Sequence, residues 1–161
     1  MIYFDLDGVL RDIHKTISWK PETWEEKYDG KTIVNYFASK PKLLAFAPVT
    51  EYFSVIVSYF DVNIITAIPD EWTEPTLFWI SKNLKGKIKS IIFAEHLKKL
   101  CYLKENDILV EDCPRYNCYS QIILIDKSYN RDINLPHTRV HTPKELLAIL
   151  LRHLRSGSCS A

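Results

Sequence analysis

The 161-residue chain has little of what marks a membrane, secreted or nucleic-acid-coating protein. Its longest apolar runs are far too short to cross a bilayer. Positive and negative side chains nearly balance, with a formal net charge of +1, so no broad electrostatic field favours a membrane surface or a long nucleic acid. We therefore expect a soluble, cytoplasmic protein that binds neither membranes nor long nucleic acids.

Cysteine is scarce as well. None of the four cysteines belongs to a CxxC pair, and the spacing of Cys113 and Cys118 does not suit zinc. The first residues turn acidic at Asp5 and carry no basic region, so a secretory signal is not expected, and the thiols should be reduced. The five histidines have no HExxH or paired spacing and are expected at the surface or in helix caps.

Five short apolar runs recur along the chain, each followed by turn or helix signals. Runs without polar alternation are typical of strands that are buried on both faces of a parallel sheet. Helix-period patterns over Thr50–Phe60 and Glu74–Leu84 separate them, and a last helix begins at the capping box Thr142-Pro143-Lys144-Glu145. The alternation predicts a doubly wound, three-layer α/β/α Rossmann-like sheet. The predicted strands are Ile2–Phe4, Val62–Ile65, Ile88–Phe93, Ile108–Val110 and Gln121–Ile125.

The chain length fits one domain over residues 1–155, followed by a flexible tail at 156–161. An irregular stretch at about residues 14–46 interrupts the alternation and is expected to form a small helical cap. Two short helices are predicted within it, at Pro21–Tyr28 and Lys31–Ser39. Its aromatic side chains can stack a substrate base or hold the cap on the core, and we favour the packing role for most of them. They are Trp19, Trp24, Tyr28, Tyr36 and Phe37.

Chemically active side chains follow four of the predicted strands. In open α/β sheets, ligands bind outside the carboxyl ends of the strands, so these side chains are expected to meet at one edge of the sheet. Two acids, a hydroxyl, a lysine and two further acids are the parts of a site for metal-assisted phosphoryl transfer. They are Asp5 and Asp7, Thr66, Lys99, and Glu111 and Asp112.

The pattern of these residues resembles that of the haloacid dehalogenase (HAD) superfamily of phosphohydrolases. Asp5-Leu6-Asp7-Gly8-Val9, after an N-terminal hydrophobic strand, resembles the first motif of the superfamily. Thr66 resembles the second motif, Lys99 the third and Ile108–Asp112 the fourth. The order and rough spacing match over residues 1 to about 131.

Two stretches are also similar to the 5′(3′)-deoxyribonucleotidase-like branch of this superfamily, namely Lys99–Asp112 and Ile125–Arg131. The chain departs from that branch at two positions. Glu111 stands where an aspartate is usual, and Asn106 stands where glycine is common. Asparagine tolerates positive φ, so the turn at this position is expected to form.

The resemblance implies a Mg²⁺-dependent phosphomonoester hydrolase. Asp5 is the implied nucleophile, which forms an aspartyl-phosphate that water then hydrolyses. Asp7 is the implied general acid and later the general base. The implied Mg²⁺ ligands are Asp5, the backbone carbonyl of Asp7, and Asp112.

Phosphate binding is implied for three further residues. Thr66 offers a hydroxyl, Ala67 a backbone N–H and Lys99 a positive charge to the transferring group. Glu111 is expected behind the metal ligands, where it orients a metal-bound water or Lys99, although an ordinary surface acid fits the sequence nearly as well. Two neighbouring lysines leave the choice of lysine open, namely Lys98 and Lys104.

The expected substrate is a small phosphorylated molecule, first of all a 5′- or 3′-(deoxy)nucleoside monophosphate. Another phosphomonoester, such as a sugar phosphate or a nucleic-acid 3′-phosphate end, is the alternative within the same chemistry. A HAD-like binding protein without turnover is the alternative from another class. The sequence does not decide between a monomer and a homodimer.

Overall fold

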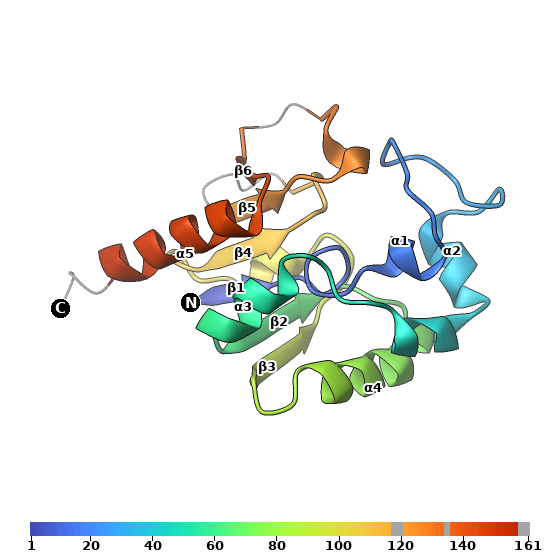
Figure 1. Ribbon diagram of the computed structural model, residues 1–161, viewed down its shortest axis with the longest axis horizontal. Coiled ribbons are helices and arrows are strands. Elements are labelled where there is room, and N and C mark those ends of the chain that lie inside the picture. Colours follow the sequence, from blue (N-terminus) through green and yellow to red (C-terminus); the bar gives the residue numbers. More distant parts are fainter. Residues whose placement is uncertain (117–120, 134–135, 158–161) are drawn as a thin grey trace.

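The computed structural model describes residues 1–116, 121–133 and 136–157, and a six-stranded sheet forms its centre (Figure 1). The strands run in the order β3-β2-β1-β4-β5-β6, and all neighbouring strands pair in parallel. The fold is therefore α/β and Rossmann-like, and all five predicted strands are present. The strands are β1 (Ile2–Phe4), β2 (Val62–Thr66), β3 (Ile88–Phe93), β4 (Ile108–Glu111), β5 (Ile122–Ile125) and β6 (Thr138–Val140).

The edge strand β6 was missed by the sequence prediction. It contains only three residues, of which Val140 alone is buried, so it carries no apolar run. Its position is fixed by pairing with β5, where Ile123 lies opposite Thr138 and Ile125 opposite Val140. A strand this short takes its conformation from its neighbour rather than from its own residue pattern.

Three longer helices pack on one face of the sheet. Because alternate residues of a strand face opposite sides, Phe4, Ile64 and Val110 lie on the same face, and they share one apolar cluster with all three helices. The helices are α3 (Phe53–Tyr59), α4 (Thr73–Asn83) and α5 (Pro143–Gly157). Within the described residues, no helix combines the length and apolarity of a bilayer-spanning segment.

The opposite face of the sheet has a thinner cover. Tyr3, Ile65 and Leu109 face this side and pack against Ala94 and Leu103, both from the segment that joins β3 to β4. That segment contains the 3-10 helix η3 (Lys99–Tyr102). The segment between β3 and β4 that covers this face also brings Lys99 to the carboxyl ends of the strands.

The predicted helix ends differ from the observed ones by a few residues. Helix α3 begins at Phe53 rather than Thr50. Helix α5 begins at the predicted capping box, in which the Thr142 hydroxyl accepts a hydrogen bond from the Glu145 N–H at 3.2 Å. The helix continues to Gly157, two residues into the predicted tail, and residues 158–161 lie outside the described part of the chain.

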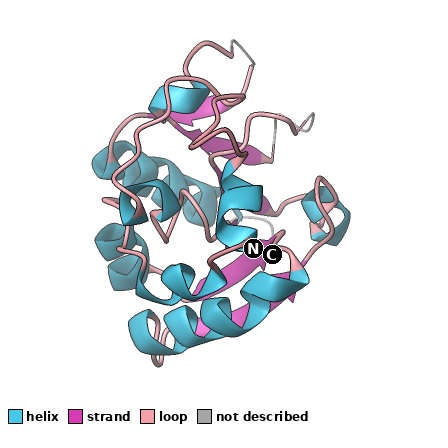
Figure 2. Cartoon of the chain, turned by 90° about the vertical axis from the view of Figure 1, so that its right-hand side faces the viewer, coloured by secondary structure: helices cyan, strands magenta, loops and turns pink. Residues whose placement is uncertain are grey.

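The insertion after β1 lies beyond the carboxyl ends of the strands. It contains α1 (Ile13–Thr16), α2 (Ile33–Ala38) and the 3-10 helix η1 (Pro41–Phe46). Figure 2 looks onto this side of the molecule, where the short helices and loops of the insertion lie in front of the sheet. The insertion is therefore placed to cover any ligand bound at that edge.

The predicted helix at Pro21–Tyr28 is wrong, since these residues form turns and bends. The carboxylate of Glu26 accepts the backbone N–H of Glu22 at 2.7 Å and the indole N–H of Trp19 at 3.2 Å. These side-chain bonds take the place of backbone helix bonds, which a helix-period pattern cannot reveal.

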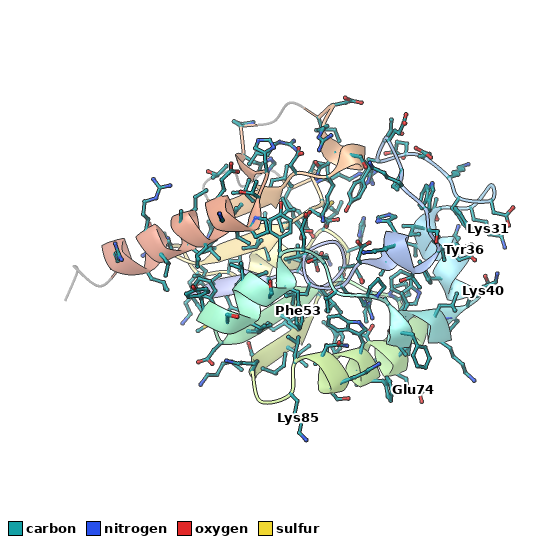
Figure 3. The ribbon with its side chains drawn as sticks, in the orientation of Figure 1. Lys31, Tyr36, Lys40, Phe53, Glu74 and Lys85 are labelled. Carbon is teal, nitrogen blue, oxygen red and sulfur yellow. The ribbon has the colours of Figure 1, made fainter. Side chains whose placement is uncertain are left out.

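Of the five aromatic residues of the insertion named above, three have a packing role. Tyr36 and Phe37 are buried in a separate apolar cluster with Trp72, and Tyr28 packs edge-on against Tyr36 at a ring distance of 4.9 Å. Tyr36 also contacts Lys40, whose ammonium lies 3.3 Å from the Tyr36 hydroxyl (both labelled in Figure 3). The other two aromatic residues, Trp19 and Trp24, line a cavity.

Candidate active site

The carboxyl ends of β1 and β4 lie side by side, and each is followed by buried carboxylates. Phe4 is opposite Val110, and the Asp5 N–H extends the ladder with a 2.9 Å bond to the Val110 carbonyl. Asp5 is 6% exposed and Asp112 is 7% exposed. One carboxylate oxygen from each of Asp5, Glu111 and Asp112 lies within 4.8 Å of the others. Apolar strands thus carry three acids into a single buried group.

Lys99 completes this group, which we call the Asp5 cluster (Asp5, Lys99, Glu111 and Asp112). Its ammonium is 2.7 Å from Asp5 and 2.8 Å from Glu111. Burial by itself lowers the pKa of Lys99, but the negative charges of Asp5 and Glu111 outweigh it and raise the pKa well above its ordinary value. Lys99 is therefore a fixed cation.

The two neighbouring lysines lie elsewhere. Lys98 is exposed and pairs with Glu95 on the surface. Lys104 is also exposed, and its backbone N–H donates to Asp107. Of the three lysines that the sequence left open, the structure brings only Lys99 to Asp5.

The Asp5 cluster holds three carboxylates and one ammonium, so its ionised form has two more negative than positive charges. Burial raises the pKa of Asp5 well above its usual range, and the charge of Glu111 adds to the effect. Burial and the charge of Asp5 raise the pKa of Asp112 to about 6. A divalent cation would neutralise this excess, and an all-oxygen donor set suits Mg²⁺, Ca²⁺ or Mn²⁺.

Glu111 uses both of its oxygens within the protein. One accepts the backbone N–H groups of Asp112 and Cys113, at 3.0 and 3.1 Å, and the other accepts from Lys99. Glu111 is fully buried, so it holds both the turn after β4 and the lysine. The structure thus places Glu111 in the interior against Lys99 and not at the surface.

Gly8 allows the first loop to approach Asp112 closely. Its φ is +83°, a conformation that glycine adopts without strain, and a Cβ at this position would lie 2.0 Å from Asp112 Oδ2. Any larger residue would displace Asp112. The glycine of the first motif therefore has a steric role in addition to its role in the turn.

Asp7 is placed differently from the expectation for a free acid and base. Both of its carboxylate oxygens accept from Arg11, with Nε at 2.6 Å and Nη2 at 3.0 Å. Arg11 is fully buried, and its guanidinium lies 5.9 Å from the centre of the Trp79 ring. Asp7 still lines the cavity, but its side chain is held in a two-pronged ion pair that the sequence did not predict.

The second predicted motif lies on the other side of β1. Thr66 ends β2, which pairs with β1, and its side chain is buried. Ala67 follows and lines the cavity. The structure thus brings the ends of β1, β2 and β4 and the start of η3 to one edge of the sheet, as predicted.

A cavity of about 380 Å³ opens above the Asp5 cluster and beneath the insertion. Such a volume is in the range of small-molecule sites. Its floor is charged, and its walls combine several aromatic rings with aliphatic, polar and charged side chains. The wall residues include His14, Trp19, Trp24, Trp72, Tyr116 and Tyr129.

Two histidines differ from the surface or cap positions expected of them. His137 is buried, and its Nε2 lies 2.9 Å from the Tyr116 carbonyl oxygen. His14 lines the cavity between Trp19 and Tyr129, and burial lowers its pKa to about 4, so it is neutral near pH 7. The contacts of His137 with Tyr116 and of His14 with Tyr129 join residues distant in the chain, which histidine spacing does not encode.

The described cysteines are free thiols, as expected. Cys113 is buried beside Asp112, and burial raises the pKa of its thiol to about 12, which makes it a poor nucleophile. Cys101 is exposed. Cys118 and Cys159 lie outside the described residues.

From the sequence, Arg11 was expected near the cleft, either to meet a second charged group or to be solvated, and Tyr129 had no assigned role. Arg11 lies four residues after Asp7, but these residues form a turn and not a helix, so the spacing alone does not predict the pair. Tyr129 donates its hydroxyl to Asp112, seventeen residues away, and no local pattern indicates that contact.

A search of protein-family models and of curated proteins finds no match to this chain. The fold and the geometry of the site are therefore the grounds for a function.

Proposed function

We propose that this protein is a Mg²⁺-dependent phosphomonoester hydrolase with the three-layer, HAD-like form of the fold and with Asp5 as nucleophile. One observation carries the proposal, namely the buried Asp5 cluster at the carboxyl ends of β1 and β4. In it a lysine contacts the proposed nucleophile, and a second aspartate lies within 4.8 Å of it. The order of the same residues along the chain resembles the HAD motifs, which supports the same function.

The donor set fits a divalent cation, with Asp5, Asp112 and the Asp7 carbonyl as the groups that would hold it. When bound, Mg²⁺ supplies positive charge that offsets the repulsion between a carboxylate and a phosphate dianion. Lys99 donates an N–H to Glu111, and its ammonium forms an ion pair with Asp5 at 2.7 Å. An ammonium has three N–H donors, so Lys99 is proposed to donate also to an oxygen of the transferring phosphoryl group.

In the proposed reaction, an Asp5 oxygen bonds to phosphorus and the ester oxygen leaves with a proton. Water then attacks the phosphorus of the aspartyl-phosphate, which releases inorganic phosphate and regenerates Asp5. Asp7 is proposed to give the first proton and to accept one from water. Since Arg11 engages both Asp7 oxygens, this ion pair must open, at least in part, before Asp7 transfers a proton.

The aromatic walls of the cavity favour a (deoxy)nucleoside monophosphate as substrate, since base faces pack well on aromatic rings. Trp19 and Trp24 are the residues of the insertion placed for this contact. The net charge of +1 gives no support for a long nucleic acid. A sugar phosphate, a nucleic-acid 3′-phosphate end, or binding without turnover are the outcomes against which the substrate is tested.

The test is phosphate release with and without Mg²⁺ from p-nitrophenyl phosphate, nucleoside monophosphates, sugar phosphates and a 3′-phosphorylated oligonucleotide. Asp5→Asn is expected to lower kcat by at least about 10³-fold, because the amide is not a nucleophile. Asp61→Asn is the control, since Asp61 is exposed and, within the described part of the chain, forms an ion pair with exposed Lys89 alone, at 3.4 Å.

Full activity in Asp5→Asn would overturn the role of Asp5. No Mg²⁺-dependent release from any of these substrates by the wild-type chain would favour a binding protein. Strong activity on the oligonucleotide alone would replace the nucleotide as substrate.

A further inference from the structure

Tyr129 connects the Asp5 cluster to the insertion. It lies in the 3-10 helix η4 (Ser128–Asn130) that follows β5, and it is 7% exposed. Its hydroxyl donates to Asp112 Oδ2. Its ring packs against His14 at 4.9 Å and Trp24 at 5.7 Å, both from the insertion. The ring thus contacts two residues of the insertion while its hydroxyl reaches a carboxylate.

The neighbouring residue holds the backbone of the same aspartate. The Asn130 amide donates to the Asp112 carbonyl at 2.8 Å and to the Ile125 carbonyl at 2.9 Å. Its oxygen accepts the Lys127 N–H at 3.0 Å and the Arg139 guanidinium at 2.7 Å. Asn130 therefore ties the turn after β5 to the turn after β4 and leaves Tyr129 little freedom to move from Asp112.

The Tyr129 hydroxyl acts on one oxygen of the Asp112 carboxylate, whereas Asn130 holds the backbone of Asp112. Oδ2 accepts from Tyr129 and also faces the space where Gly8 lacks a Cβ. Tyr129 leaves the other oxygen, Oδ1, to a different partner. A buried hydroxyl that donates to one carboxylate oxygen fixes the rotamer of the acid and directs the second oxygen to a cation.

We infer that Tyr129 is a positioning residue, whose hydroxyl holds Asp112 in the orientation that binds the divalent cation. The inference rests on the proposed function, since it takes the cation site of that proposal as its starting point. The hydroxyl group, and not the ring, positions Asp112. Removal of the oxygen alone should therefore weaken cation binding while the fold stays intact.

The test is Mg²⁺ binding to the full chain, measured by isothermal titration calorimetry without substrate, for wild type and Tyr129→Phe. The phenylalanine ring keeps the contacts with His14 and Trp24 and loses only the hydrogen bond. The Kd for Mg²⁺ is expected to rise about 10- to 100-fold. The melting temperature in EDTA is measured in parallel, to separate a loss of orientation from a loss of fold.

Tyr52→Phe is the matched control. Tyr52 is a fully buried tyrosine whose hydroxyl has no hydrogen-bond partner within the described residues, so its removal should leave the Kd unchanged. A wild-type Kd in Tyr129→Phe would overturn the inference, as would an equal loss in Tyr52→Phe or a wild-type chain that binds no Mg²⁺. If Tyr129→Phe does not fold, Tyr129→His, whose ring can donate an N–H, must retain Mg²⁺ binding for the inference to stand.

The outcome is separate from that of the proposed function. A wild-type chain that binds Mg²⁺ but releases no phosphate would overturn the hydrolase proposal. The role of Tyr129 would still be decided by the Kd values, because no substrate enters that measurement.

Discussion

Two clusters of charged residues lie at the carboxyl end of the same sheet, and their charges are balanced in opposite ways. The Asp5 cluster, between β1 and β4, places three buried carboxylates around one lysine. A second group follows β5 and β6, where three basic side chains surround one carboxylate. We call it the Asp126 cluster, and it consists of Asp126, Arg131, Arg139 and His141.

The pKa values of the aspartates in the two clusters are shifted in opposite directions. Asp126 is 2.8 Å from Arg131, 3.1 Å from Arg139 and 3.5 Å from His141. Burial by itself raises the pKa of Asp126, but hydrogen bonding and charge from Arg131 outweigh it and lower the pKa below its usual value. In the Asp5 cluster, burial and the charge of Asp5 raise the pKa of Asp112 to about 6.

The difference separates a structural ion-pair network from a binding site. In the Asp126 cluster, basic side chains offset the charge of the single carboxylate, and the ion pairs connect β6 to the loop after β5. The Asp5 cluster lacks positive charge and lies under a cavity, which is the arrangement expected where a cation and an anionic substrate bind together. Four experiments test whether the two clusters differ in this way.

Removal of the lysine should have the largest effect. Lys99→Met leaves three buried carboxylates without a cation and should lower the free energy of unfolding by about 3–5 kcal/mol in EDTA. Saturating Mg²⁺ should restore part of this loss. Urea unfolding with and without Mg²⁺ measures both effects.

Lys98→Met provides the matched control, because Lys98 is exposed and its pair with Glu95 is on the surface. Its effect should stay within about 0.5 kcal/mol. Equal effects of the two substitutions would contradict the charge imbalance.

Gly8→Ala is expected to cause the second-largest loss of unfolding free energy. The positive φ costs an alanine about 1–2 kcal/mol, and the overlap of its Cβ with Asp112 should add about 1–3 kcal/mol. Gly30→Ala isolates the first contribution, because Gly30 has φ +70° and no atom within 4 Å of the added Cβ. Unfolding free energies of the two variants that agree within error would exclude the close approach to Asp112.

In EDTA, the two clusters should make the free energy of unfolding depend on pH in opposite directions. The folded chain binds a proton at Asp112 more tightly than the unfolded chain does, so this contribution to stability is present at low pH and lost as pH rises through about 6, by up to about 3 kcal/mol. The lowered pKa of Asp126 works the other way, and its contribution is lost as pH falls through the folded-state pKa.

Urea midpoints between pH 3 and pH 8 for wild type, Asp112→Asn and Asp126→Asn separate the two contributions. Asp112→Asn should reduce the slope of the Asp5 cluster, to which the raised pKa values of Asp5 and Glu111 also contribute, and should leave the opposite slope unchanged. Asp126→Asn should reduce only the opposite slope. Mg²⁺ should suppress the slope of the Asp5 cluster and leave that of Asp126. The same sign of slope from both positions would refute the comparison.

The smallest effect is expected for Asp126→Asn at neutral pH. Hydrogen bonds from charged partners contribute about 1.5–3 kcal/mol when buried, but Arg131 is 64% exposed, so a loss of about 1–2 kcal/mol is expected. Mg²⁺ affinity and phosphate release should stay at wild-type values. A large loss of either would mean that the Asp126 cluster also belongs to the site.

Much of the core could be predicted from the sequence because short apolar runs are local signals. The strands from Ile2 and Ile88 begin and end as predicted, and the capping box marks the start of α5 correctly. Prediction failed where one side-chain contact replaces a regular backbone bond. Glu26 is the example, since its carboxylate caps a turn where the residue pattern indicates a helix.

Neighbouring residues are enough to predict the parallel α/β core and the order in which Asp5, Thr66, Lys99 and Asp112 follow successive strands, because apolar runs and strand-end residues are properties of adjacent positions. Three contacts become visible only in the folded chain, namely Lys99 with Asp5, Arg11 with Asp7 and Tyr129 with Asp112. Lys99 and Tyr129 reach their partners through strand pairing between segments far apart in the chain. Arg11 reaches Asp7 across a turn that pairs with distant Val49, and residue spacing does not predict these pairings.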